Sequence, residues 1–173
     1  MPMRRHLLRC SLWVLCSLGL ALLAGCGFAL RQPPSFNFQH LHLDGPSSSV
    51  MFQSVVRNLQ GIDGLKVTTD SREREQAQVV LILGNEVPFK EITGRTATGA
   101  VREFNLRLSV SFRVVDRRGV ELLPNTTLTQ RRDISFSESA ALSKETEEQM
   151  LYAEMRDDVL QQLLRRLANV KLR

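Results

Sequence analysis

The chain has 173 residues, of which 43% are hydrophobic, and a formal net charge of +5. This length suits a single domain with one core. Arg4, Arg5 and Arg9 lie in a predicted leader, and without them 20 basic residues face 18 acidic ones. The small remaining excess gives no argument for a nucleic-acid partner.

The first 25 residues have the pattern of an export signal that is removed. A basic start is followed by an uncharged apolar run over residues 10–23. This run is shorter than the roughly 20 residues that a membrane-spanning helix needs. Leu23, Ala24, Gly25 and Cys26 then resemble a lipobox, which predicts cleavage before Cys26 and acylation of its sulfur and new amine.

Residues 26–35 include two prolines and are predicted to form a tether between the lipid and a domain over residues 36–173. Gly27 stands where enterobacterial lipoproteins retained in the inner membrane carry Asp, which favours the outer membrane, on its periplasmic side. Cys10 and Cys16 leave with the signal and Cys26 is alkylated. The mature domain is therefore expected to have no disulfide.

The first half of the domain alternates between extended and helical patterns. Residues 36–43 predict a strand that ends at Asp44, Gly45 and Pro46. Residues 50–60 carry apolar side chains at helical spacing, with serines before them and Gly61 after them, and predict a helix. Residues 65–69 are expected to be a short extended segment, and the charged residues 71–78 a surface segment.

Three strands are predicted next. Residues 78–89 include an apolar run typical of a central strand, and Pro88 is expected to end its regular pairing. Residues 90–99 are expected to form a flexible hairpin connection. Residues 103–114 alternate strictly between polar and apolar, which predicts a long strand with one buried and one wet face. A further strand is expected at residues 122–136.

The chain ends in a predicted helix of about 25 residues that Ser143 caps, with acids early, arginines late and an apolar stripe between them. The elements together predict an α+β fold. We expect a two-layer sandwich, with two helices packed on one face of a mostly antiparallel four-stranded sheet. The wet face of the long strand would then remain uncovered by helix.

The sequence contains few of the residue patterns that catalysis or cofactor binding requires. His40 and His42 are the only histidines after the signal and share one strand face, which favours an ordinary pair over a metal site. No nucleophile elbow, phosphate loop or dinucleotide motif is present. We therefore expect no enzyme, no cofactor and no metal.

Basic residues are the one recurring polar feature with a plausible ligand, because guanidinium groups match phosphate oxygens. From the charge pattern alone, ordinary solubilising charges are the favoured interpretation. The basic residues in question lie on or near the predicted strands and the last helix: Arg95, Arg102, Arg107, Arg113, Arg131, Arg132 and Lys144.

The sequence resembles the LptE family of lipopolysaccharide-assembly lipoproteins in three places. The mature start, from Cys26 through Phe28 and Leu30 to Arg31, is similar to the family's opening, although Gln32 stands where the family often has Gly. The segment from Thr98 to Gly119 is similar to its long strand and turn. The closing helix matches through residues such as Glu154, Met155 and Arg166.

The resemblance implies a protein that plugs the lumen of the outer-membrane β-barrel LptD. It also implies help in assembling that barrel and inserting lipopolysaccharide into the outer leaflet, with direct lipopolysaccharide binding. Under this reading we expect lipid phosphates to contact Arg95, Arg102, Arg107 and Lys144.

Two other functions remain open. A free periplasm-facing lipid-binding lipoprotein would need an internal cavity and no barrel partner. A surface-anchored hydrolase would depend on His40 and His42.

Overall fold

The computed structural model describes residues 35–172. The predicted signal peptide, the predicted lipidation site at Cys26 and all but the last residue of the predicted tether lie outside these residues. The described residues belong to one compact unit. Among the described residues, no helix is both long enough and apolar enough to cross a membrane.

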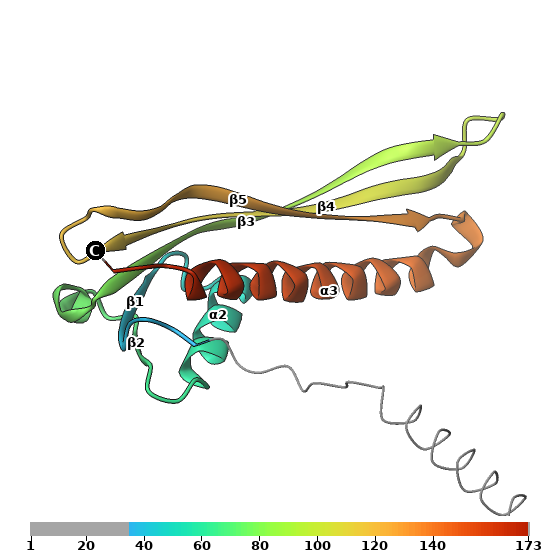
Figure 1. Ribbon diagram of the computed structural model, residues 1–173. Helices are drawn as coiled ribbons and strands as arrows, with labels where there is room; N and C mark the ends of the chain where they lie inside the picture. The colour runs from blue at the N-terminus through green and yellow to red at the C-terminus, as the bar shows by residue number, and fades with distance from the viewer. Residues whose placement is uncertain (1–34, 173) are drawn as a thin grey trace, which may run out of the picture. The chain divides into compact units, whose positions relative to one another are not determined.

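The described chain forms a five-stranded mixed sheet in the order β2-β1-β3-β4-β5 (Figure 1). Its strands are β1 His40–Asp44, β2 Lys66–Thr68, β3 Val79–Arg95, β4 Val101–Asp116 and β5 Glu121–Ser135. The α+β class is confirmed, but the prediction of four mostly antiparallel strands is wrong in detail. The short extended segment predicted at residues 65–69 is a fifth strand, and β1 pairs in parallel with both β2 and β3.

Helical crossovers explain the parallel pairs. α2 (Val50–Gln60) connects β1 to β2, and the 3-10 helix η1 (Ser71–Gln76) connects β2 to β3. Parallel strands need such a crossover, because the chain must return to the end of the sheet where the first strand began before the next strand can align in parallel. The predicted charged surface segment at residues 71–78 is this second crossover.

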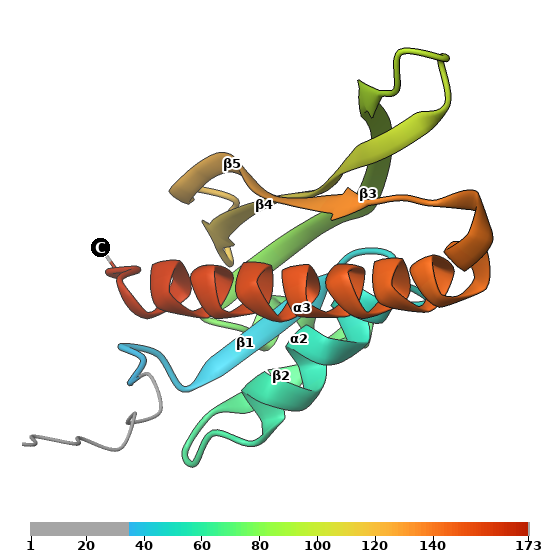
Figure 2. The ribbon, with the colours of Figure 1, turned by 90° about the vertical axis from the view of Figure 1, so that its right-hand side faces the viewer.

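The helices pack on one side of the sheet, as Figure 2 shows. At the start of α2, the Ser49 hydroxyl oxygen accepts a hydrogen bond from the Phe52 amide at 3.0 Å. The long helix α3 (Ala141–Ala168) follows a short 3-10 helix, η2 (Glu138–Ala140), and runs along β4 and β5. It begins ahead of the predicted cap, because Ser143 lies in its first turn and donates to the Ala140 carbonyl at 2.8 Å.

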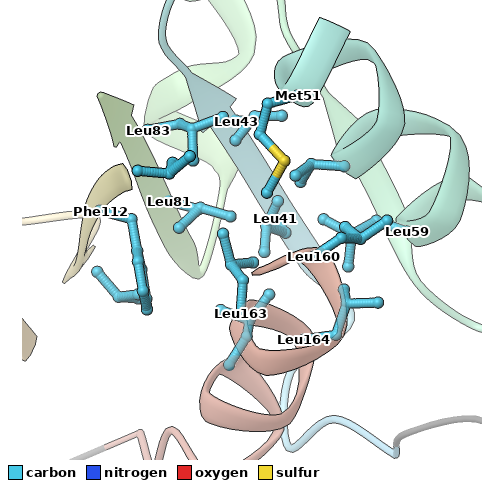
Figure 3. Close-up of a cluster of buried hydrophobic side chains, with 14 of the residues drawn as sticks. Leu41, Leu43, Met51, Leu59, Leu81, Leu83, Phe112, Leu160, Leu163 and Leu164 are labelled. Atoms are coloured by element: carbon cyan, nitrogen blue, oxygen red, sulfur yellow. The ribbon is translucent and has the colours of Figure 1, made fainter. Parts of the chain in front are cut away.

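The core is divided into two clusters on the helix side of the sheet. The larger joins β1, α2, β3, β4 and the second half of α3, and it includes Leu41, Leu81, Phe112 and Leu163 (Figure 3). The smaller consists of Leu106, Leu108, Ile134 and Met155 and lies under the outer half of the sheet. The alternation predicted for residues 103–114 is borne out, because the even-numbered side chains from Leu106 to Val114 are buried.

β3 is longer than the sequence suggested. Pro88 lies opposite Leu108, and pairing with β4 continues to Arg95, so the flexible connection expected at residues 90–99 is largely strand. Pro88 does not end the pairing with β4, because β1 pairs with the other side of β3 only from Val79 to Ile82. Beyond that point β3 is an edge strand, where proline is tolerated. The connection itself is short and uses Gly99 at φ +88°.

Candidate functional site

α3 is fastened to the outer half of β3 by polar side chains spaced four residues apart on one helix stripe. Arg156 donates through Nε to Glu86 Oε1 at 2.6 Å, and the Tyr152 hydroxyl donates to the Phe89 carbonyl at 3.1 Å. Glu148 forms an ion pair with Lys90. Three contacts in series thus hold the edge strand against the helix.

A surface hollow of about 390 Å³ lies between this part of α3 and the sheet, and we call it the helix-side hollow. Its lining combines aromatic rings, two lysines and two glutamates: Lys90, Phe104, Ile134, Ser135, Phe136, Ala141, Lys144, Glu145, Glu148, Gln149 and Tyr152. The Lys90 ammonium lies 4.2 Å from the centre of the Phe104 ring, which meets Phe136 edge to face. The hollow therefore offers apolar surface beside cationic groups.

Lys144 is the predicted site residue in this hollow. Its ammonium donates to Glu147 at 2.8 Å and to the Ser135 hydroxyl at 3.0 Å. It lies near the start of α3, where the helix dipole is positive and disfavours a cation. A bound anion would relieve that repulsion. Burial, and after it the Glu148 carboxylate, raises the pKa of Tyr152 above 10.0, so its hydroxyl remains a donor at neutral pH.

Arg95 and Arg102 lie together at the tip of the β3–β4 hairpin. They line a second hollow of about 440 Å³, the hairpin hollow, with Gly94, Glu103, Asp133 and Ser135. Arg95 Nη1 also donates to the Gly99 carbonyl at 2.9 Å. Ser135 lines both hollows, so Arg95, Arg102 and Lys144 border neighbouring depressions.

Arg107 is not part of this group. It alternates with the buried Leu106 and Leu108 and therefore projects from the sheet face that α3 does not cover. Its guanidinium carbon lies 4.5 Å from the centre of the Phe89 ring. The structure thus separates Arg107 from Lys144, and Arg107 lines neither hollow.

Sequence reasoning missed Lys90 and the aromatic lining of the helix-side hollow. Lys90 fell in the predicted flexible connection, whereas in the structure it lies opposite Leu106 and faces α3. Residues paired across two strands project to the same side, so pairing with Leu106 would have placed Lys90 on the helix side. The aromatic residues come from three separate elements, and nothing in the sequence indicates that they meet.

The two histidines lie on β1. His42 is 2% exposed, and its Nδ1 lies 3.3 Å from the Thr68 hydroxyl oxygen. Burial lowers the pKa of His42 below 6.5. Within residues 35–172, His40 Nε2 is buried without a hydrogen-bond partner, and no cluster of three or more His, Cys, Asp or Glu is arranged to hold a metal ion.

Comparison with known proteins identifies relatives along most of the chain. The family model described as "LptE: Lipopolysaccharide-assembly" matches residues 38–167. The LPS-assembly lipoprotein LptE of Pectobacterium atrosepticum is 28% identical over 158 residues, covering 88% of this chain and 83% of the relative.

Two solved lipoprotein structures have similar folds. Lipoprotein B of Nitrosomonas europaea has a TM-score of 0.70 and 27% identity, with 82% of this chain and 90% of that chain covered. The rare lipoprotein B of Shewanella oneidensis has a TM-score of 0.63 and 24% identity, with 75% and 93% covered, and supports the fold alone.

Proposed function

The chain belongs to the LptE family of lipopolysaccharide-assembly lipoproteins, and from that premise we propose that it is the lipid-anchored plug of the outer-membrane barrel LptD. In this role it assists assembly of the barrel and insertion of lipopolysaccharide into the outer leaflet. The family match over residues 38–167 is the observation that carries the proposal.

The surface of the sheet is compatible with a plug. The lumen of an outer-membrane barrel is polar, so a protein inside it can expose hydroxyl and charged groups. The uncovered face presents Ser109 paired with Thr129 by their hydroxyls at 3.0 Å, and Asn105 donating to Asp133 at 2.7 Å. The lipobox ending at Cys26 supplies a membrane anchor for the same proposal.

We further propose that lipopolysaccharide contacts the helix-side hollow and the hairpin hollow. Apolar ring surface beside Lys90 and Lys144 suits a lipid whose head group carries phosphates. Arg95 and Arg102 extend the cationic border toward the hairpin tip. Arg107 lines neither hollow and stands outside this proposed contact.

Copurification tests the plug. The full-length tagged chain is expressed in its native host and recovered from detergent-solubilised outer membranes. A large β-barrel recovered in a one-to-one ratio is the expected result. A lipidated chain recovered without a barrel would contradict the plug and favour a free lipid-binding lipoprotein.

Charge reversal tests the lipid contact. Lys144→Glu should reduce the lipopolysaccharide retained by the purified protein about tenfold, because a charged donor is replaced by a repelling carboxylate. Lys171→Glu makes the same charge change at an exposed position beyond α3 and should retain wild-type binding. Equal binding by both variants would refute the assignment to the helix-side hollow.

A further inference from the structure

The sheet face opposite α2 and α3, which we call the outer face, is organised in rungs that cross β3, β4 and β5. Directly paired residues project to the same side, so each rung is a row of three neighbouring side chains. From the hairpin inward, the rungs are Glu91–Asn105–Asp133, Phe89–Arg107–Arg131 and Val87–Ser109–Thr129. Charge is therefore sorted into bands, with the two arginines in the central rung.

The central rung contains an unfavourable pair. Arg107 and Arg131 are direct cross-strand partners, and like charges in that position destabilise a sheet. Neither forms an ion pair with any of residues 35–172. Asp133, one rung away, instead accepts a hydrogen bond from Asn105. Two adjacent guanidinium groups thus lack a counter-ion within the described domain.

The same rung exposes apolar surface. Phe89 is 44% exposed although Arg107 stacks on its ring, and Val87 in the next rung is 55% exposed. A cation over an aromatic ring is attracted to it, so the contact favours this position of the Arg107 side chain. Exposed aromatic and arginine side chains held side by side are the residue types that dominate binding energy at protein interfaces.

We propose that the rung Phe89–Arg107–Arg131 is a docking site for a protein wall that presents carboxylates. Asp or Glu side chains would accept paired hydrogen bonds from the two guanidinium groups and remove their mutual repulsion. The exposed Phe89 and Val87 would pack on apolar groups beside them. A lipid phosphate matches the arginines equally well, but it gives no role to the neighbouring row of Val87, Ser109 and Thr129.

The inference rests on the proposed function, because the barrel's inner wall is the partner it implies. It goes further by assigning the central rung of the outer face to that wall. Lipid is assigned to the helix-side hollow and to the hairpin hollow, which borders the outermost rung at Asp133. The central rung and the two hollows then have separate ligands and can be disrupted separately.

The test uses full-length tagged chains in the native host. Arg107→Glu and Arg131→Glu are compared with Arg117→Glu, which makes the same charge change at an exposed position in the β4–β5 turn. We expect each rung variant to lower barrel copurification at least fivefold, while Arg117→Glu and lipopolysaccharide retention stay at wild-type levels. Thermal unfolding of each variant establishes that it is folded.

Site-specific photo-crosslinking supplies a second readout. A photoreactive residue at exposed Thr129 should attach to a barrel peptide containing Asp or Glu, and one at exposed Ala153 on α3 should not. Replacing that barrel acid with Arg should restore copurification of Arg131→Glu.

Lower lipopolysaccharide retention with unchanged barrel recovery would overturn the inference and make the outer face a phosphate site. Unchanged recovery of both would also overturn it. A wild-type chain that recovers no barrel refutes the proposed function itself. Photo-crosslinking then tests this inference on its own, because absence of any protein adduct at Thr129 would overturn it.

Discussion

The contact between Glu86 and Arg156 permits a quantitative prediction about how α3 holds the edge strand. The Arg156 Nε and Glu86 Oε1 atoms are 2.6 Å apart, and the two side chains are 26% and 12% exposed. Exposed ion pairs contribute about 0.2–1 kcal/mol, whereas loss of one partner from a buried pair costs about 3–5 kcal/mol. This pair lies between those limits, so we expect a coupling energy of about 1–2 kcal/mol.

A double-mutant cycle measures that coupling. Glu86→Gln, Arg156→Met and the double variant are made in the compact unit beginning at Pro34, and each is unfolded in urea. Arg156→Met should be the more damaging single change, because it leaves a poorly exposed carboxylate without a partner. We expect a loss of about 2 kcal/mol, or a Tm lower by about 8 °C for a domain of this size.

The Lys66–Glu73 pair is the matched control, because its side chains are 59% and 39% exposed at a similar distance of 2.9 Å. Its coupling should stay below about 0.5 kcal/mol and vanish at high salt. If the Glu86–Arg156 cycle is additive, or no stronger than this control, the ion pair does not fasten α3 to β3 and the reasoning fails.

Three further predictions concern the core, acid stability and the anchor. Met155→Ala should lower the free energy of unfolding by about 2–4 kcal/mol because Met155 is fully buried. Leu142→Ala is the control on the same helix; because Leu142 is 83% exposed, the free energy should change by less than about 0.5 kcal/mol. Similar urea midpoints for both variants would contradict the packing of α3. Because burial lowers the pKa of His42 below 6.5, the folded state binds fewer protons than the unfolded state between the two pKa values. The free energy of unfolding should therefore fall as the pH drops below about 6.5. His42→Gln should flatten this part of the plot of unfolding free energy against pH. An unchanged slope in this variant would show that another group is responsible. Cys26→Ser should abolish incorporation of labelled fatty acid and release the chain from the membrane fraction, and continued labelling would refute the lipobox assignment.

Local patterns in the sequence predicted the elements whose side-chain period is regular. The strict alternation around Leu106 and Leu108 identified β4, and the spacing of Met51, Val55 and Leu59 identified α2. The prediction for Pro88 was wrong because the effect of proline depends on whether a strand is central or at an edge. That property comes from the length of β1, which pairs with only the start of β3.

The candidate surfaces depended even more on long-range pairing. The sequence singled out Arg107 as a basic residue on a wet strand, but its partners Phe89 and Arg131 follow from register. Register is set by bulges and by the short turn at Gly99, and neither can be read from residue type alone. Lys144 was selected from the sequence only as a basic residue, and the aromatic hollow around it arises only in the folded chain.

Surface lipopolysaccharide in cells depleted of this chain tests the central claim most directly. The chain is placed under a repressible promoter in its native host, and newly labelled lipopolysaccharide accessible at the cell surface is measured over time. An assembly factor predicts that surface lipopolysaccharide falls as the protein disappears, and that the wild-type gene in trans restores it. Unchanged delivery to the surface after the protein is gone would contradict the account.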